Sequence, residues 1–423
     1  MKAAEVKLWG TRIGVIAKNG DTPFYSFRYD PRFVPSKIEV SPVHLPLADQ
    51  TYTFTNLALS SFYGLPGLLA DMLPDRFGQT LIESWLLANG KKMTDFDSID
   101  RLCYLGTRGM GALEFFPDRN QEMNQSETIA VDQLTDLAHA ILMQKKAIQM
   151  PLKTHEDIIK VGTSAGGARA KAIVAFDVKK GIIQSGQIDA GKDFTYWIMK
   201  FDGDDQGNPA DYTRLEYAYY LMAKAAKIDM MPSRLWQTDR YTHFMTQRFD
   251  RIRLANGKLD KVHMHTLGGL LHMNFNQPGL LSCEEASATM RQIGLKRLDI
   301  EQFYRRMVFN VITRNCDDHV KNTSFLMNRQ GEWSLSPAYD ITYAYNPLGA
   351  WTASHQMRIN GKLTDITKKD LLQTAASVMI KEEKAISIIQ EVKDAFQSWP
   401  DFAKLAGLNL KTISLVKEQL IRL

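Results

Sequence analysis

The chain is poor in cysteine, with only Cys103, Cys283 and Cys316 among its 423 residues. Their spacing matches no zinc motif, and three cysteines do not make a disulfide framework. No hydrophobic run approaches the roughly 20 apolar residues that are needed to cross a bilayer. The first residues lack the apolar core and the small-residue cleavage site of a signal peptide. These absences favour a cytoplasmic protein in a reducing compartment, without a membrane partner.

An excess of charge of one sign is also missing. The 52 basic and 47 acidic residues leave a net charge of +5, which is small for this length. Such an excess permits contact with phosphates or nucleic acid but does not argue for it. Hydrophobic residues at 44% and charged residues at 23% are ordinary for a globular protein. Because one core rarely serves so long a chain, two or three domains are expected.

Two common nucleotide and metal motifs are absent. No segment has the GxxxxGK[ST] spacing of a Walker A loop. Asp202 and Asp204 begin like a calcium-binding EF-hand loop, but Thr213 stands at the twelfth position, which needs a bidentate carboxylate. Calcium binding of this kind is therefore excluded, and residues 202–211 are predicted to form a solvated loop.

The order of predicted elements is strands with an embedded helix, followed mainly by helices. An N-cap at Thr367, with Asp370 three residues later, predicts the start of a late helix. This order fits an α+β protein and is also the order of a two-lobed kinase. Alternation predicts strands over 6–10, 12–17, 24–29, 171–176, 195–201 and 241–248. Helical spacing predicts helices over 65–89 (with a break at Pro74), 131–148, 211–227 and most of 283–423 except 315–362.

The most informative stretch is the polar segment 314–322, which reads RNCDDHVKN and is followed later by Tyr339 and Asp340. Phosphoryl transfer needs a carboxylate to accept the substrate proton, and a carboxylate and an amide oxygen to hold Mg²⁺. Asp317, Asn322 and the later Asp340 have the spacing of a kinase catalytic loop and its metal-binding aspartate. The alternative is a polar turn between helices.

Two further features match phosphate binding. Lys200 ends an apolar strand, and the helix after it carries Glu216, which is the layout of the strand lysine and helix glutamate of protein kinases. A lysine in this position can also simply extend into solvent. Residues 162–171 are rich in Gly and Ala, which let backbone N–H groups approach a phosphate. The alternative for that segment is a flexible linker.

Together these residues resemble the HipA-like serine/threonine kinase toxins of type II toxin–antitoxin systems. The resemblance rests on the loop 317–322, the later 339–341, the strand ending at 247–251 and the loop 164–171, and it covers essentially the whole chain. It implies a two-lobed protein-kinase-like α+β fold with a β-rich N-terminal subdomain and a mainly helical C-lobe. The implied domains are a β-rich subdomain with helices over 1–120, a kinase N-lobe with phosphate loop, strand lysine and hinge over 121–255, and a C-lobe with catalytic loop and metal-binding aspartate over 256–423.

The resemblance also implies a role for each matching position. Asp317 would accept the proton, and Asn322 and Asp340 would bind Mg²⁺. Ser164 would be an autophosphorylation site that displaces the phosphate loop and switches the kinase off; a plain loop serine is the alternative. The nucleotide-binding residues would be Gly166, Gly167, Ala168, Arg169, Ala170, Lys171, Lys200, Gln247, Arg248, Phe249, His319, Val320, Lys321, Asn322, Tyr339 and Asp340.

The implied activity is an ATP- and Mg²⁺-dependent protein serine/threonine kinase acting as a toxin. Its substrate would be a translation component such as an aminoacyl-tRNA synthetase, and a DNA-binding antitoxin would link it to operator DNA. Two other classes stay open: a DNA-associated co-repressor partner with little catalysis, and a small-molecule kinase on the same fold. The first is disfavoured by the intact set of Asp317, Asn322, Asp340 and Lys200. Ser164 in the phosphate loop favours a protein substrate over the second.

Overall fold

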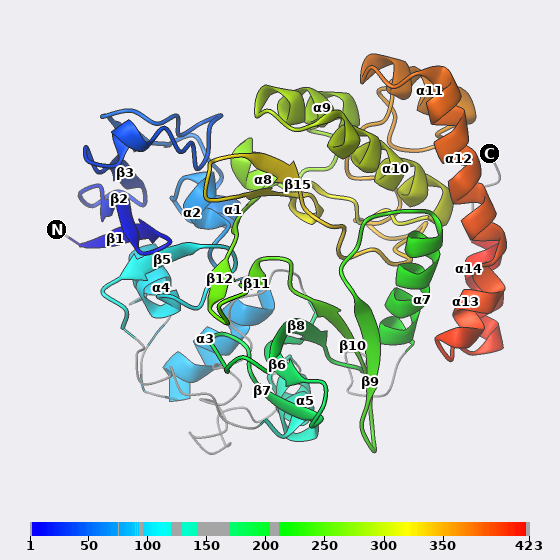
Figure 1. The fold of residues 1–423 in the computed structure, drawn as a ribbon, viewed down its shortest axis with the longest axis horizontal. Coiled ribbons are helices and arrows are strands. Elements are labelled where there is room, and N and C mark those ends of the chain that lie inside the picture. The colour runs from blue at the N-terminus through cyan, green and yellow to red at the C-terminus, as the bar shows by residue number, and fades with distance from the viewer. Residues whose placement is uncertain are drawn as a thin grey trace. The chain divides into compact units, whose positions relative to one another are not determined.

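The computed structural model describes residues 2–74, 76–88, 90, 92, 96–119, 129–142, 169–203 and 211–419. These residues form two compact units, which are described separately (Figure 1). Unit 1 comprises Met1–Ser41, Leu45–Thr213 and Arg234–Met264, and unit 2 comprises Pro42–His44, Arg214–Ser233 and His265–Leu423. No helix in the described ranges is long and apolar enough to cross a membrane.

Unit 1 begins with a five-stranded antiparallel sheet in the order β4-β3-β2-β1-β5. Its first two strands form a hairpin through Trp9 and Gly10, both with positive φ, as a tight two-residue turn requires. The three predicted N-terminal strands are confirmed, whereas the short β4 and β5 were not predicted. The strands are β1 (Ala3–Leu8), β2 (Thr11–Lys18), β3 (Tyr25–Tyr29), β4 (Thr51–Thr53) and β5 (Leu113–Phe116).

Most helices of this part of the chain lie between strands of the same sheet, and only α5 follows its last strand. The predicted break at Pro74 is confirmed, because one helix ends before it and the next begins after it. A capping box of Asp97 and Asp100 starts α4. The helical elements here are η1 (Val34–Ser36), α1 (Leu59–Phe62), α2 (Gly67–Ala70), α3 (Arg76–Ala88), α4 (Ser98–Leu105) and α5 (Val131–Leu142).

A second five-stranded sheet has the order β7-β6-β8-β10-β9. Its side chains Phe176, Trp197 and Met245 share one buried core with residues of α3 and α5. The three strands predicted here are confirmed, and a two-stranded ribbon of β11 and β12 follows them. The bounds are β6 (Lys171–Asp177), β7 (Ile182–Ser185), β8 (Thr195–Lys200), β9 (Ser233–Gln237), β10 (Thr242–Gln247), β11 (Arg251–Arg253) and β12 (Leu259–Lys261).

The prediction of a solvated loop is wrong at its first residue, Asp202. Its carboxylate is buried and accepts hydrogen bonds from the backbone N–H of Thr242 (3.0 Å) and of Gly203 (2.9 Å). Its own N–H donates to Nδ1 of His243 at 3.0 Å. Asp202 therefore satisfies one backbone donor at the start of β10 and one in its own turn. Residues 204–210 lie outside the described ranges.

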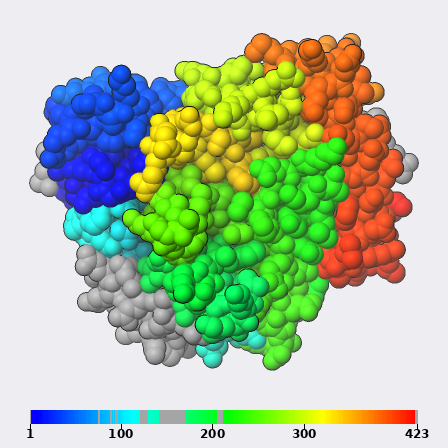
Figure 2. Space-filling view, in the orientation of Figure 1, coloured from blue at the N-terminus to red at the C-terminus, as the bar shows by residue number. Residues whose placement is uncertain are grey.

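Unit 2 is mainly helical, as predicted, with the buried α10 in its core and a small sheet of β13, β14 and β15. The predicted cap at Thr367 is confirmed as a capping box with Asp370. Figure 2 shows the C-terminal helices as one continuous orange-to-red surface. The elements are α7 (Tyr212–Ala225), β13 (His263–Thr266), α8 (Leu267–Leu270), α9 (Cys283–Gln292), α10 (Arg297–Thr313), η5 (Val320–Asn322), β14 (Ser324–Met327), β15 (Trp333–Leu335), α11 (Lys368–Ser377), α12 (Glu382–Gln397), α13 (Trp399–Leu405) and α14 (Leu410–Gln419).

Candidate active site

The loop that carries the predicted chemistry starts where α10 ends. Arg314 adopts a left-handed backbone (φ 56°), which ends the helix and turns the chain. The buried Asn315 then bonds back to Asn310 twice, backbone to backbone and side chain to side chain, both at 3.0 Å. The N–H of Cys316 donates to the carbonyl of Ala344 at 3.1 Å. These contacts fix the backbone directly before Asp317.

The Asp317 carboxylate is held on one side and partly open on the other. Its Oδ1 accepts a hydrogen bond from Nε1 of Trp351 at 2.6 Å and lies 3.7 Å from Nε2 of His319. Burial raises the pKa of Asp317, and the nearby Asp340 carboxylate raises it further, while His319 and Trp351 oppose the shift. The side chain is nevertheless 39% exposed. A raised pKa makes the carboxylate a better proton acceptor, which suits a general base.

Asn322 lies at the end of the short helix η5, where the same loop fixes its orientation. Nδ1 of His319 accepts the N–H of Lys321 at 3.2 Å and so caps η5. Nδ2 of Asn322 donates to the carbonyl of Asp317 at 2.7 Å. Because the amide nitrogen is engaged in the loop, the amide oxygen is oriented away from that contact. The buried Val320 packs closely against Gly268. A larger residue at position 268 would place its Cβ only 2.9 Å from Cγ2 of Val320, so glycine is needed there.

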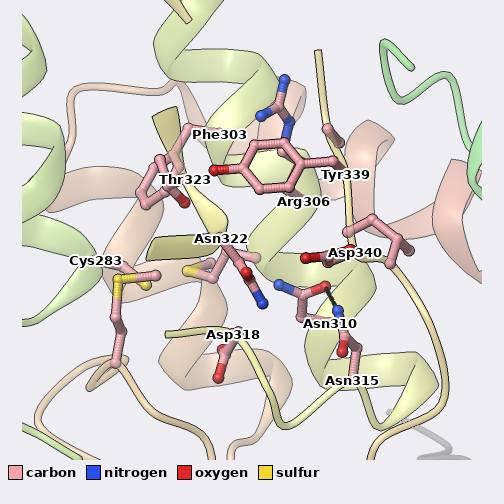
Figure 3. A pocket seen from close by; sticks show the side chains of 14 residues that line it. Cys283, Phe303, Arg306, Asn310, Asn315, Asp318, Asn322, Thr323, Tyr339 and Asp340 are labelled. Atoms are coloured by element: carbon pink, nitrogen blue, oxygen red, sulfur yellow. Dashed lines mark hydrogen bonds between the residues drawn. The ribbon is translucent and has the colours of Figure 1, made fainter. Parts of the chain in front are cut away.

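Asp340 shares a pocket of unit 2 with Asn322, and Figure 3 shows both side chains directed into it. The hydroxyl of the preceding Tyr339 donates to the carbonyl of Lys321 at 2.7 Å and is also hydrogen-bonded to Ser324. This ties the two predicted segments together. Asp340 itself has φ 52°, a left-handed conformation that costs energy for a residue other than glycine. Strain of this kind is concentrated at functional sites.

The donors of this pocket fit magnesium. An amide oxygen from Asn322 and a carboxylate from Asp340 are hard oxygen ligands, and Mg²⁺ takes one or two such groups together with phosphate oxygens and water. The described residues contain no cluster of three or more His, Cys, Asp or Glu side chains that could hold a metal. Asp318 also lines the pocket, but its two oxygens already accept from His355 Nδ1 (2.9 Å) and the N–H of Gln356 (2.7 Å).

The predicted phosphate-binding lysines belong to unit 1. Lys171 begins β6 and Lys200 ends β8, and they are direct partners in the antiparallel register of these strands. Cross-strand partners project from the same face of a sheet, so the two lysines lie side by side on one face. Nζ of Lys200 lies 6.0 Å from the centroid of the Phe244 ring. This arrangement fits the binding of a polyphosphate.

The remaining predicted phosphate-loop residues are described only in part. Arg169 stacks its guanidinium 4.0 Å from the centroid of the Tyr212 ring, and the carbonyl of Ala170 accepts the N–H of Phe201 at 3.0 Å. Ser164, Gly166, Gly167 and Ala168 lie outside the described residues. Glu216 belongs to unit 2 and Lys200 to unit 1, so their pairing stays a prediction.

The predicted hinge, Gln247 to Phe249, follows β10. The N–H of Arg248 donates to the carbonyl of Tyr196 at 2.8 Å, and its buried side chain makes two hydrogen bonds to Asp250, at 2.8 and 2.7 Å. Arg251 also binds Asp250, at 2.8 Å. The side chain of Arg248 is therefore occupied within unit 1, and contact with adenine through the backbone stays a prediction.

Asp250 was not singled out by the sequence analysis, although it lies between two arginines. Burial alone would raise the pKa of Asp250, yet the two guanidinium groups and the N–H of Gly111 hold it well below its usual range. Arg251 also donates to the carbonyls of Gly109 (2.7 Å) and Gly111 (2.9 Å). The network connects the segment after β10 to the loop before β5. A carboxylate between two arginines, directly after a buried strand, is the sequence signal that could have revealed it.

We expect Asp250→Asn to destabilise the fold by about 3–5 kcal/mol, because it leaves two buried arginines without a compensating charge. The measurement is the free energy of unfolding in urea. Asp189→Asn is the matched control, since Asp189 pairs with Arg253 in the same unit but is half exposed, and exposed pairs contribute little. Equal losses in the two variants would contradict a special role of the buried network.

The fold and the arrangement of Asp317, Asn322 and Asp340 fit the class of protein-kinase-like proteins. Comparison with protein families supports this class over most of the chain. Residues 4–116 match the HipA N-terminal domain, and residues 163–399 match the HipA-like C-terminal domain. The chain therefore belongs to the HipA-like family, and the family resemblance predicted from the sequence is confirmed.

Individual relatives agree with this assignment. The Sinorhizobium fredii protein named "Putative kinase Y4mE" is 25% identical over 338 residues, which are 76% of this chain and 73% of that protein. A second protein of that organism, "Putative kinase Y4dM", is 31% identical over 102 residues, 24% of this chain and 25% of that protein. The Shewanella oneidensis MR-1 HipA structure, solved with HipB and operator DNA, has a TM-score of 0.69 at 16% identity and covers 98% of this chain and 94% of that one. The predicted kinase-like α+β fold is thereby confirmed.

Proposed function

We propose that this protein is an ATP-dependent serine/threonine protein kinase that acts as a HipA-like toxin in the cytoplasm. The observation that carries the proposal is the pairing of Asn322 and Asp340 in one pocket, with Asp317 presented by the same loop as Asn322. A base next to two oxygen ligands for Mg²⁺ is what phosphoryl transfer requires of a protein. The proposed division is a β-rich subdomain over 1–120, an N-lobe over 121–255 and a C-lobe over 256–423.

Each part of the proposed site has a separate task. Asn322 and Asp340 would hold Mg²⁺, and Lys171, Lys200 and the loop 166–170 would bind the phosphates of ATP. The backbone of 247–249 would bind adenine, and residues 319–321 with Tyr339 would line the nucleotide site. Bound Mg²⁺–ATP supplies the phosphoryl group that is transferred. Asp317 accepts the proton of the acceptor hydroxyl, since its carboxylate is partly exposed and its pKa is raised.

The test uses purified protein, labelled ATP and Mg²⁺, with and without cell extract. The proposal expects label on serine or threonine of the protein itself or of an extract protein, and none with Asp317→Asn. Label on a small molecule alone would favour the small-molecule kinase. Absence of any transfer, together with binding to an antitoxin on operator DNA, would favour the co-repressor.

The proposed partners follow from the family. HipA of Shewanella oneidensis MR-1 was solved in a complex with HipB and operator DNA, and we propose a DNA-binding antitoxin as the partner of this chain as well. The proposed substrate is a translation component such as an aminoacyl-tRNA synthetase. Quantitative phosphoproteomics of cells that express the parent or Asp317→Asn measures this directly. Phosphosites confined to proteins unrelated to translation would contradict it.

We further expect the protein to phosphorylate itself on Ser164. A phosphate adds roughly two negative charges, which would repel the phosphates of ATP and offer acceptors to Arg169 or Lys171. The measurement is peptide mass spectrometry on the parent and on Asp317→Asn produced in parallel. The parent should carry phosphate on the peptide with Ser164, and the variant should not. Equal phosphate on both proteins would mean that another kinase modifies this site.

A further inference from the structure

A later segment of unit 2, Trp351 to Gln356, lies directly against the loop that carries the base. Nε1 of Trp351 donates to Oδ1 of Asp317 at 2.6 Å. Nδ1 of His355 and the N–H of Gln356 hold the two oxygens of Asp318, at 2.9 and 2.7 Å. The Gln356 amide donates to the carbonyl of Cys316 at 3.3 Å. Three successive residues of the loop are thus held by this one segment.

Trp351 is itself fixed in place, so its hydrogen bond to the base is not an isolated surface contact. Its carbonyl accepts Nε2 of Gln356 at 2.6 Å. Its indole ring also lies beside the His319 ring, with centroids 6.1 Å apart. Because the Trp351 side chain is already fixed, it loses little conformational entropy when its N–H binds the carboxylate. Hydrogen bonds to ionised groups are also stronger than those between neutral groups.

The contact makes the two oxygens of Asp317 unequal. Oδ1 is occupied by the indole N–H, whereas no described residue donates a hydrogen bond to Oδ2. The side chain is 39% exposed and Oδ1 already accepts the indole N–H, which leaves Oδ2 for an acceptor hydroxyl. Orientation of a base within a fraction of an ångström decides how efficiently it works.

We propose that Trp351 is a positioning residue that holds Asp317 through Oδ1, so that Oδ2 receives the proton of the acceptor hydroxyl. This role rests on the proposed kinase activity and adds a residue that the loop spacing could not reveal. During transfer the O–H bond of the acceptor breaks and its proton passes to Oδ2. The acceptor oxygen forms a bond to the γ-phosphorus of ATP, while the bond from that phosphorus to the β–γ bridging oxygen breaks and ADP leaves with the electron pair. Trp351 keeps its own proton in this step.

The kinetic test is Trp351→Phe, which keeps a ring and removes the N–H donor. Loss of a hydrogen bond to a charged group corresponds to a fall of about ten- to a hundredfold in kcat, while the KM for ATP should stay unchanged. An unchanged kcat would overturn the proposal. A higher kcat would overturn it as well, because Trp351 would then be blocking the base.

A matched control separates this role from general stability. The fully buried Trp399 donates its indole N–H to the carbonyl of Ile413 at 3.1 Å in the same unit. Trp399→Phe removes an indole hydrogen bond of the same kind, and it should lower the melting temperature more than Trp351→Phe but leave kcat nearly unchanged. A parallel loss of kcat in the two variants would show a structural effect and overturn the positioning role.

A second measurement does not depend on activity. The indole N–H of Trp351 gives a ¹H–¹⁵N resonance, which its loss in Trp351→Phe identifies among the seven tryptophans. In Asp317→Ala this resonance should move upfield because its acceptor is gone, whereas the other indole resonances should stay. An unmoved resonance would overturn the proposed contact. If the parent protein transfers no phosphate at all, the proposed function fails, and this measurement still decides whether Trp351 holds Asp317.

Discussion

Asp317→Asn lowers the rate of phosphoryl transfer by about 10²–10⁴-fold, the range typical for the loss of a general base. The amide has the shape of the carboxylate but cannot take up the proton of the substrate hydroxyl. Its Oδ1 can still accept the hydrogen bond from Trp351, so the loop keeps its arrangement. The measurement is single-turnover transfer of label from ATP, together with the affinity for ATP, which should stay near that of the parent.

The same substitution should not weaken the fold. The pKa of Asp317 is raised in the folded protein because burial disfavours its charge. Such a group contributes stability only below its unfolded pKa, and that contribution is lost as the pH rises, so at neutral pH the charge is a cost. Removal of the charge should therefore leave the melting temperature equal or higher. Transfer near the parent rate, or a loss of rate accompanied by unfolding, would contradict the assignment of Asp317 as the base.

The local parts of the candidate site could be predicted from the sequence, because their residues are close together in the chain. Asp317, His319 and Asn322 belong to one loop, in which Asn322 donates to the carbonyl of Asp317 and His319 accepts the N–H of Lys321. The capping box of Thr367 and Asp370 is likewise a signal within one helical turn. In both cases the chemistry of neighbouring residues was enough.

Contacts between distant segments could not be predicted in this way. Trp351 and His355 reach Asp317 and Asp318 from 34 and 37 positions along the chain, and nothing in their own surroundings marks them. Asp202 was misread for the same reason: polar neighbours suggested solvent, whereas the structure buries its carboxylate on the N–H of Thr242, 40 residues later. A polar residue that satisfies a backbone donor in the fold looks like a loop residue in the sequence.

Asp340→Asn removes the dependence of nucleotide binding on Mg²⁺, with an expected loss of at least about a hundredfold in affinity, since even outer-shell partners of a metal cost 10–100-fold. Asparagine is the better test residue than alanine. Asp340 has φ 52°, a left-handed backbone that asparagine tolerates and that costs alanine about 1–2 kcal/mol. The measurement is titration with a non-hydrolysable ATP analogue, with Mg²⁺ and with EDTA.

Asp365 offers a matched control for this prediction. It is an aspartate of the same unit with φ 51°, exposed and outside the pocket lined by Asn322 and Asp340. Asp365→Asn therefore makes the same chemical change at the same backbone conformation, and it should leave the Mg²⁺ dependence intact. Asp340→Ala should lose the Mg²⁺ dependence as well, and in addition lower the free energy of unfolding because of its strained backbone. If Asp340→Asn bound the analogue as tightly as the parent and still required Mg²⁺, Asp340 would be structural, and the oxygen pair with Asn322 would not be the metal site.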